Sequence, residues 1–318
     1  MVITADAAVI GGGVTGASIT FHLAKLGFKV VCVEKNYLAS GATGKSSAIV
    51  RMHYDNEPEV RMAFASLPYF QNWKDIVGIG DCGFKVTGFL RLVDPEDYDK
   101  LKANVATMKR IGVKTRIINR EEVKEIAPTY SSDDIELAAW EPESGYVDPC
   151  GTTFGFMSAA ERLGAKLLSS RVVTGIKVEF GKICGVETNQ GFISTRIVIN
   201  AAGAFAAKVA EMVGCVLPVT PIRYQAGIFR RPFEIESHHP ITIDRLAGHF
   251  YFRPDEKGHI LVGGIGAKKG IDPENYNETT EPGYSVNALN LLEKRIPGME
   301  RGVFRGGRAA CDGVSDDE

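Results

Sequence analysis

The stretch AAVIGGGVTG at residues 7–16 decides the fold of this chain. Its four leading apolar residues predict a short buried strand, and the glycines that follow have the spacing G-x-G-x-x-G. Residues 17–26 then predict an amphipathic helix that stops at Gly27, and residues 28–34 predict a second buried strand. Strand, turn, helix and strand in this order form the βαβ unit that begins a Rossmann-like, doubly wound sheet.

The glycine turn has the chemistry of a phosphate-binding loop. Gly11 permits the tight turn, Gly13 lets the backbone approach a pyrophosphate, and Gly16 lets the helix pack close to the strand. The first turn of the helix, with Val14 and Thr15, directs free N–H groups and the positive end of the helix dipole at the phosphates. The sequence therefore predicts a dinucleotide site here.

Glu34 ends the second strand, where an acidic residue bonds the ribose hydroxyls of a dinucleotide. An acidic side chain disfavours a 2′-phosphate, so NADP is not expected. The motif alone does not separate NAD from FAD. The non-functional alternative is a glycine-rich turn beside an exposed glutamate.

The pattern changes after residue 80. Residues 88–93 and 227–230 read as strands among charged helices, while residues 196–200 predict another buried strand of the first sheet. We expect an α/β protein in which a Rossmann-like domain is interrupted by an α+β domain with a mostly antiparallel sheet. The expected boundaries are 1–80 and 146–217 for the first domain, 81–145 and 218–304 for the second, and 305–318 for the start of an incomplete C-terminal segment of the first.

Composition excludes several classes of protein. Hydrophobic residues make up 44% and charged residues 24% of 318, and the formal net charge of -2 gives no indication of nucleic acid. The six cysteines are scattered without metal-ligand spacing, so reduced thiols and no metal site are expected. No signal peptide and no apolar stretch of about 18 residues is found, so we expect no transmembrane helix and a cytoplasmic location by default.

Four further segments resemble the D-amino-acid oxidase and sarcosine oxidase superfamily of flavoproteins. In that family similar segments form a flavin loop, a G-x-(I/V)-D-P turn, a strand end that packs against FAD, and a strand pair of the substrate domain. The resemblance covers nearly the whole chain, in order, and is nearest to sarcosine oxidase β-subunits, L-proline dehydrogenases and dimethylglycine dehydrogenases. The segments are SGATGKSS at 40–47, GYVDP at 145–149, VINAAGA at 198–204, and FYFRP at 250–254 with two glycines at 263–264.

This resemblance implies non-covalent FAD as the cofactor and makes the Rossmann-like domain an FAD-binding domain. To the glycine turn and Glu34 it adds a second group of residues that would contact the cofactor. They are Lys35, Ser40, Thr43, Ser46, Ser47, Val173, Ala201, Ala202 and Gly203.

The segment IVRMHY at residues 49–54 resembles the I-R-x-x-Y element of sarcosine oxidases and implies that Arg51 binds a substrate carboxylate. A planar guanidinium can hold a carboxylate by two parallel charge-assisted bonds, although a structural salt bridge is the alternative. Tyr251 matches an active-site tyrosine of glycine-oxidase-like members, or is an ordinary aromatic residue of a sheet face. His53 tunes the flavin or acts as a base, or is a hydrogen-bonded structural histidine. Arg308 is a further candidate for the carboxylate.

The function implied by the resemblance is FAD-dependent oxidation of a small secondary amine or amino acid of the sarcosine, proline, glycine or dimethylglycine type. A hydride would pass from the carbon beside the nitrogen to flavin N5, and water would hydrolyse the resulting imine. The first alternative is a non-catalytic FAD-binding subunit of a multi-subunit amine dehydrogenase. The second is an NAD-dependent dehydrogenase, which would lack the element at residues 201–203.

Two departures from the family bear on the electron acceptor and on completeness. Monomeric sarcosine oxidases carry an oxygen-activating lysine where this chain has Leu261, with Lys268 and Lys269 further along, so a quinone or a partner protein is expected as acceptor. Residues 311–318 resemble only the start of the family's closing element, which implies a truncation or a second subunit that completes the site. Cys311 is out of register with the cysteine that binds flavin covalently in some members.

Overall fold

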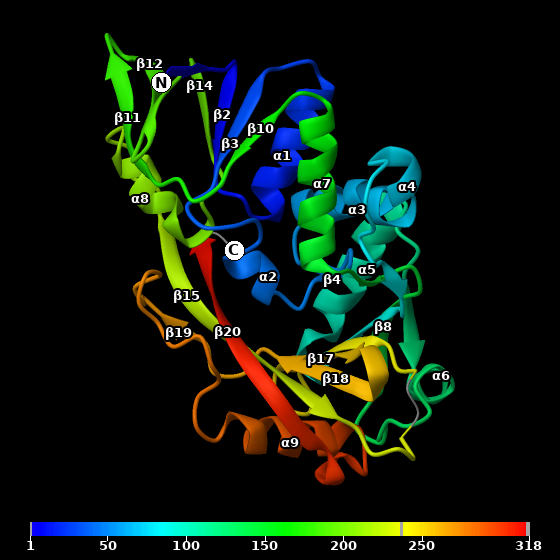
Figure 1. Cartoon of the computed structure of the whole chain (residues 1–318). Coiled ribbons are helices and arrows are strands. Elements are labelled where there is room, and N and C mark those ends of the chain that lie inside the picture. Colours follow the sequence, from blue (N-terminus) through cyan, green and yellow to red (C-terminus); the bar gives the residue numbers. More distant parts are fainter. Residues whose placement is uncertain (1, 236–237, 316–318) are drawn as a thin grey trace.

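The structure is a computed structural model that describes residues 2–235 and 238–315. Its first part contains a four-stranded parallel sheet, with helices α1 and α7 packed against each other beside it (Figure 1). The central strands are fully buried because apolar side chains face covering layers on both sides. In sheet order the strands are β10 (Lys166–Leu168), β3 (Val30–Val33), β2 (Ala7–Ile10) and β14 (Ile197–Asn200), and the helices are α1 (Val14–Lys25) and α7 (Pro149–Arg162).

A second four-stranded sheet packs against this parallel sheet. Val186 and Ile193 of the second sheet form one core cluster with Val31 and Val33 of the parallel sheet. The first part of the molecule therefore has the layers of a dinucleotide-binding fold. In sheet order the second sheet contains β1 (Val2–Thr4), β13 (Gly191–Ser194), β12 (Lys182–Thr188) and β11 (Val173–Glu179).

Strand β14 differs from expectation in its burial. The strand forms where it was predicted, but Ile197 is 45% exposed and no residue of β14 is buried. The prediction of a buried strand is wrong because β14 lies at the edge of the parallel sheet, where among the described residues β2 is its only neighbour in that sheet.

The inserted part is built on a nine-stranded sheet whose strands are mostly antiparallel, as expected. Only the pairing of β16 with β6 is parallel. In sheet order the strands are β19 (Lys268–Lys269), β15 (Val219–Arg230), β18 (His259–Gly263), β17 (Phe250–Asp255), β16 (Ile241–Asp244), β6 (Phe89–Leu92), β8 (Leu137–Glu141) and β7 (Arg116–Asn119), and β20 (Val303–Ser315) pairs with β15.

Helix α9 (Tyr284–Arg295) covers one face of this sheet with Ala288 and Leu292 in its core (Figure 1). Further helices join the two parts. A three-stranded sheet pairs residues 49–50 and 85–86 with residues 145–146. The remaining elements are α2 (Ala42–Lys45), α3 (Glu57–Gln71), α4 (Trp73–Ile76), α5 (Tyr98–Ile111), α6 (Arg120–Ile126), α8 (Ala206–Glu211), β4 (Ile49–Val50), β5 (Lys85–Val86), β9 (Gly145–Tyr146) and the 3₁₀ turns Pro95–Asp97, Gly203–Phe205, Glu256–Gly258 and Met299–Arg301.

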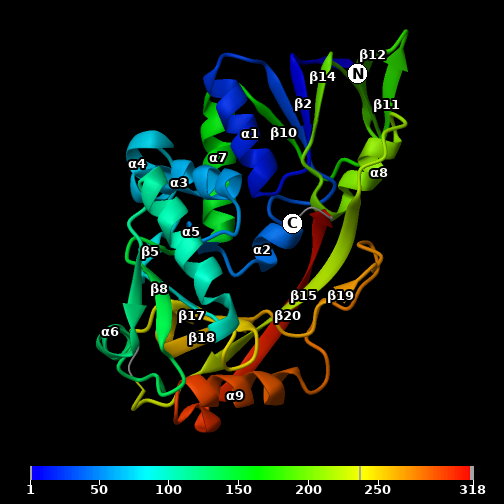
Figure 2. The ribbon, with the colours of Figure 1, turned by 180° about the vertical axis from the view of Figure 1, so that it is seen from behind.

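A long two-stranded ribbon connects the two parts (Figures 1 and 2). Strand β15 pairs with β20 from Val219 opposite Ser315 to Arg230 opposite Val303. The sequence predicted a strand only at 227–230 and assigned 305–318 to the first domain. Residues 316–318 of that segment lie outside the described residues, and the domain boundaries stay predictions.

Candidate cofactor and substrate site

The glycine turn requires glycine for steric reasons. Gly11 has a φ of 114°, and a Cβ atom there would lie 2.3 Å from the carbonyl oxygen of Ala201. A Cβ atom at Gly16 would lie 1.9 Å from the carbonyl oxygen of Gly11. Gly13 is the N-cap residue of α1 and supplies no side-chain acceptor, so the first turn is open to a phosphate.

Glu34 is buried at the end of β3, with 8% of its surface exposed. Its Oε2 accepts a hydrogen bond from Gly12 N at 2.7 Å, and its Oε1 accepts one from Asn36 N at 2.8 Å. The alternative of an exposed glutamate is therefore wrong. Arg171 N donates to the Glu34 carbonyl, which brings the chain before Val173 beside this carboxylate.

The loop at residues 40–47 is held against the large sheet by two arginines. Arg253 donates from Nε to the Ser47 carbonyl at 2.7 Å. Arg308 donates from Nε to the Lys45 carbonyl and from Nη2 to the Ser46 carbonyl, both at 2.9 Å. Arg253 was not predicted as a site residue, and two nitrogens of Arg308 that could bind a carboxylate have backbone acceptors instead.

A cavity of about 840 Å³ lies between this loop and the large sheet. Its size is in the range of small-molecule sites. Of the predicted site residues, those that line it are Val14, Thr15, Thr43, Ser46, Ser47, Arg51 and Tyr251, with Arg308. The others lie outside its lining: Gly11, Gly13, Gly16, Glu34, Lys35, Ser40, His53, Val173, Ala201, Ala202 and Gly203.

Several of the residues outside the lining lie at or beside the glycine turn. Ala201 N donates to the Ile10 carbonyl, which sets the 201–203 turn against the glycine turn. Lys35 pairs with Glu274 at 3.0 Å, so its ammonium has a protein partner. Thr43 Oγ1 accepts from Val14 N at 3.1 Å and joins the 40–47 loop to α1.

Arg51 follows β4 and presents its guanidinium to the cavity. Its Cζ lies 4.0 Å from the centroid of the Tyr54 ring and 5.8 Å from that of Phe89. Within residues 2–235 and 238–315 no hydrogen bond or ion pair to the guanidinium is found, so the structural salt bridge that was its alternative has no partner there. An unpaired cation on a cavity wall is placed to meet an anionic ligand.

Tyr251 reaches the cavity from β17. A Cβ atom at Gly263, its neighbour on β18, would lie 2.2 Å from the hydroxyl, so the ring requires glycine opposite it. Burial raises the pKa of Tyr251, and its hydrogen bond to Ser47 lowers the pKa only in part. The phenol is therefore protonated at neutral pH and can donate.

His53 is 3% exposed and is not among the residues that line the cavity. Burial first, and then the positive charges of Arg91 and Arg51, lower its pKa to about 3. The imidazole is therefore neutral near pH 7. Its Nδ1 lies 3.8 Å from Oε1 of Glu141, a buried residue that was not predicted as a site residue.

Strand β20 has one face toward the cavity and the other face away from it. Arg308, Ala310 and Asp312 line it, whereas Cys311 points to the opposite face because side chains alternate along a strand. Burial raises the pKa of Cys311 to about 11, which keeps the thiol protonated. Asp312 was not predicted as a site residue, and burial raises its pKa as well.

Leu261, which the resemblance aligned with the oxygen-activating lysine of monomeric sarcosine oxidases, is buried in the large sheet. Leu261 is 1% exposed and pairs with Arg253 across β17 and β18. Lys268 is ion-paired with Glu281 at 3.0 Å, and neither it nor Lys269 lines the cavity.

The described part of the chain has neither a metal-ligand cluster nor a membrane-spanning helix. It holds no group of three or more His, Cys, Asp or Glu side chains arranged for a metal ion. It also holds no helix with the length and apolar character to cross a membrane. All six cysteines are free thiols.

The fold and the cavity are those of a two-domain, dinucleotide-dependent oxidoreductase. The model of the family described as FAD dependent oxidoreductase matches residues 6–315, and the chain belongs to this family. Its cofactor is FAD, so the NAD-dependent alternative is wrong.

Individual proteins agree with this membership. The chain is 28% identical to sarcosine oxidase subunit beta of Rhizobium meliloti, over 93% of this chain and 71% of that protein. It is 27% identical to mitochondrial dimethylglycine dehydrogenase of Homo sapiens, over 81% of this chain but only 30% of that protein's length. It is 26% identical to the mitochondrial pyruvate dehydrogenase phosphatase regulatory subunit of Mus musculus, over 93% of this chain and 35% of that one.

Among solved structures, L-proline dehydrogenase from P. horikoshii superposes with a TM-score of 0.91 at 30% identity, covering 100% of this chain and 83% of that one.

The residues present fit FAD. The turn at Gly11 and Gly16 leaves backbone where a side chain would stand, and Gly13, the N-cap residue of α1, places no side chain over the first turn. Each Glu34 oxygen accepts one backbone N–H and keeps acceptor capacity for ribose hydroxyls.

Proposed function

We propose that this chain oxidises a small secondary amine or amino acid that carries a carboxylate, of the sarcosine, dimethylglycine, proline or glycine type. The observation that carries the proposal is the unpaired guanidinium of Arg51 on the wall of the cavity. The names of the relatives, which are dehydrogenases and oxidases of such compounds, support the same substrate class.

The residues of the chain would bind and orient this substrate. Arg51 would hold the carboxylate by two parallel hydrogen bonds, and the Tyr54 ring against it restricts the guanidinium plane. Tyr251, protonated at neutral pH, would donate a hydrogen bond from β17. FAD, when bound, supplies the acceptor for the hydride of the substrate. We further propose a quinone or protein acceptor for the electrons, since the resemblance places Leu261 where monomeric sarcosine oxidases carry an oxygen-activating lysine.

A second candidate function is a non-catalytic FAD-binding subunit. The observation that favours it is the similarity to a protein named as a regulatory subunit, over 93% of this chain. Such a subunit would bind FAD without being reduced by any amine. The similarity to sarcosine oxidase subunit beta supports assembly with other subunits under either function.

The test is anaerobic reduction of the purified, FAD-loaded chain by sarcosine, dimethylglycine, L-proline and glycine in turn. We expect one of them to bleach the flavin band at about 450 nm. For that substrate, Arg51→Ala should raise KM about 100-fold, because a desolvated charge-assisted pair is lost. Arg61→Ala is the control, because Arg61 is exposed and paired with Glu57. A flavin that none of the four reduces would favour the non-catalytic subunit.

A further inference from the structure

A buried carboxyl group lies behind Arg51. Glu141 ends β8 and has no exposed surface. Its Oε2 accepts hydrogen bonds from Met52 N at 3.1 Å and from Ser144 Oγ at 2.7 Å. Met52 N belongs to the peptide unit that follows Arg51. The carboxyl therefore fixes the backbone from which the guanidinium extends into the cavity.

The second oxygen of this carboxyl group faces His53. Oε1 of Glu141 and Nδ1 of His53 are both buried without a hydrogen-bond partner among the described residues, and they lie 3.8 Å apart. Leaving two such atoms unpaired is costly, and native structures rarely do so. A shift of about 0.6–1 Å would bring them within hydrogen-bond distance. The geometry requires one proton between them, because two acceptors would repel each other.

Burial shifts the pKa values of the two groups in opposite directions. It raises the pKa of Glu141, against the hydrogen bonds from Ser144 and Met52 N and the positive charge of Arg51, which lower it. It lowers the pKa of His53 to about 3, together with the positive charges of Arg91, Arg51 and Lys100 and against the negative charge of Asp55. Both directions favour an uncharged acid beside an uncharged imidazole.

We propose that Glu141 is a positioning residue of the substrate site. It is held as an uncharged acid, accepts from Met52 N and Ser144, donates to His53 Nδ1, and so aims the Arg51 guanidinium at the substrate carboxylate. The inference rests on the proposed function of Arg51. It assigns to His53 the part of an acceptor in this pair.

Kinetics of two variants test the hydrogen-bond part of the proposal. Glu141→Gln keeps an oxygen for Met52 N and Ser144 and places an amide donor toward His53, so we expect KM within about twofold of the wild type. Glu141→Ala removes all three bonds and should raise KM for the carboxylate substrate about tenfold or more, with a smaller change in kcat and unchanged FAD content. Equal effects of Gln and Ala, or a wild-type KM for Ala, would overturn the proposal.

Two controls separate this inference from the proposed function. Glu143→Ala removes a partly exposed carboxylate that pairs with Lys114 at 2.6 Å, and it should leave KM unchanged. If Arg51→Ala leaves KM unchanged, the proposed function of Arg51 fails. If Arg51→Ala raises KM but Glu141→Ala does not, only the present inference fails.

Infrared spectroscopy tests whether Glu141 is protonated, even if the Glu141→Ala variant does not fold. The infrared spectrum at neutral pH should contain the carbonyl stretch of a protonated carboxylic acid that is shielded from water. This band should be absent from Glu141→Gln and present in Glu143→Ala. A wild-type spectrum without it would show that Glu141 is ionised and would overturn the proposal.

Discussion

The glycine turn leaves no room for a side chain at Gly16. A methyl group at Gly16 would lie 1.9 Å from the Gly11 carbonyl oxygen, which is backbone and cannot rotate away. We expect Gly16→Ala to lower the free energy of unfolding by about 1–3 kcal/mol through overpacking. It should also reduce FAD occupancy, because α1 must move away from the turn. Chemical denaturation and the flavin-to-protein absorbance ratio measure the two effects.

Ser18→Ala is the control for this prediction, since Ser18 lies in the same helix and its hydroxyl bonds only locally to His22. It should change neither quantity appreciably. Full FAD occupancy in Gly16→Ala would contradict the close approach of helix and turn seen here.

His239 predicts a loss of stability in acid. It is 4% exposed, its Nε2 has no hydrogen-bond partner within the described part of the chain, and burial lowers its pKa to about 4. The unfolded chain takes up this proton at about pH 6.5, whereas the folded chain does not until about pH 4. Stability is therefore present above about pH 6.5 and is lost as pH falls, by about 2 kcal/mol between pH 7 and pH 5.

Urea unfolding of the wild type and of His239→Gln at these two pH values measures this contribution. The variant should lose less stability in acid than the wild type, with His53 still contributing in the same direction. An equal loss in both proteins would show that His239 is protonated in the folded state.

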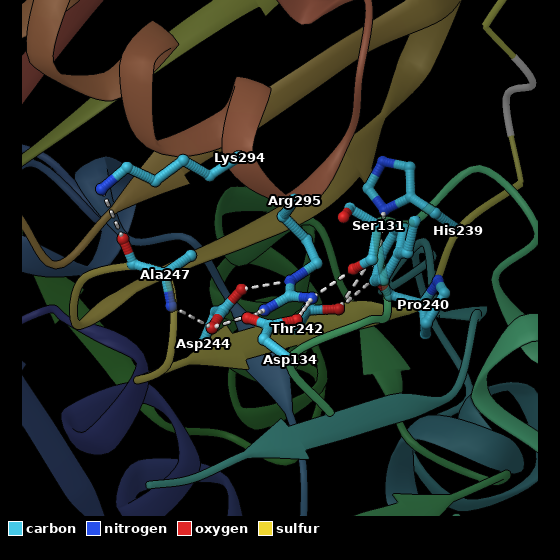
Figure 3. Close-up of polar contacts among 10 residues, drawn as sticks. Ser131, Asp134, His239, Pro240, Thr242, Asp244, Ala247, Lys294 and Arg295 are labelled. Atoms are coloured by element: carbon cyan, nitrogen blue, oxygen red, sulfur yellow. Dashed lines mark hydrogen bonds and ion pairs between the residues drawn. The ribbon is translucent and has the colours of Figure 1, made fainter. Parts of the chain in front are cut away.

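At the scale of elements, one arginine fixes helix α9 to the large sheet (Figure 3). Arg295 has no exposed surface. It donates from Nε to Asp244 at 2.6 Å and from Nη1 and Nη2 to Asp134 at 2.9 Å each. It also donates to the carbonyl oxygen of Ser131. The buried Asp244 thus depends on Arg295 for its counter-charge.

We expect Arg295→Leu to lower the free energy of unfolding by about 3–5 kcal/mol, because it leaves the Asp244 carboxylate buried without its partner. Arg301→Leu is the matched control, since Arg301 is exposed and its ion pairs are 3.7 Å long. Denaturant titration compares the two. A loss below about 1 kcal/mol in Arg295→Leu would show that water or another group compensates Asp244.

Elements with clear end signals could be predicted from the sequence. Helix α7 begins after Asp148, whose side chain caps it, and Pro149 at its first position marks the same boundary in the sequence. Strands β15 and β20 could not be predicted at full length. Pro221 and several glycines interrupt them, and only their mutual pairing makes them strands. Strand β8, with the sequence LAAWE, has no alternation and a single strong strand former, Trp140.

The candidate site divides in the same way. The glycine turn and Glu34 follow from a local motif, whose spacing is visible in one stretch of sequence. Glu141 and Arg253 could not be recognised, because each acts through a contact far along the chain, with Met52 and with Ser47. A contact between residues about 90 or 200 positions apart leaves no local pattern.

At the scale of the whole molecule, the two parts share the chain. It passes from the parallel sheet to the large sheet and back before β15 and β20 run between them (Figures 1 and 2). We therefore expect one cooperative unfolding transition, with FAD release coincident with loss of both sheets. Trp73 packs on Phe156 in the first part, and Trp140 lies on β8 in the second, so each reports one part.

Fluorescence-detected denaturation of Trp73→Phe and Trp140→Phe makes the comparison. Each variant is compared with its own unfolding curve from circular dichroism, which corrects for any change in stability. Coincident curves are expected for both. Separate midpoints for the two fluorophores would show that the parts unfold independently.

The interleaved sheet also bears on how such a chain diversifies by inheritance. A single genetic crossover between β8 and β15 would combine β6 from one parent with β16 from the other, although these two strands are parallel neighbours in one sheet. Exchange of the large sheet as a module would need three crossovers, one before β6, one between β8 and α7, and one between α8 and β15. New substrate preferences in this architecture are therefore expected to arise by substitution around the cavity, with the large sheet inherited whole.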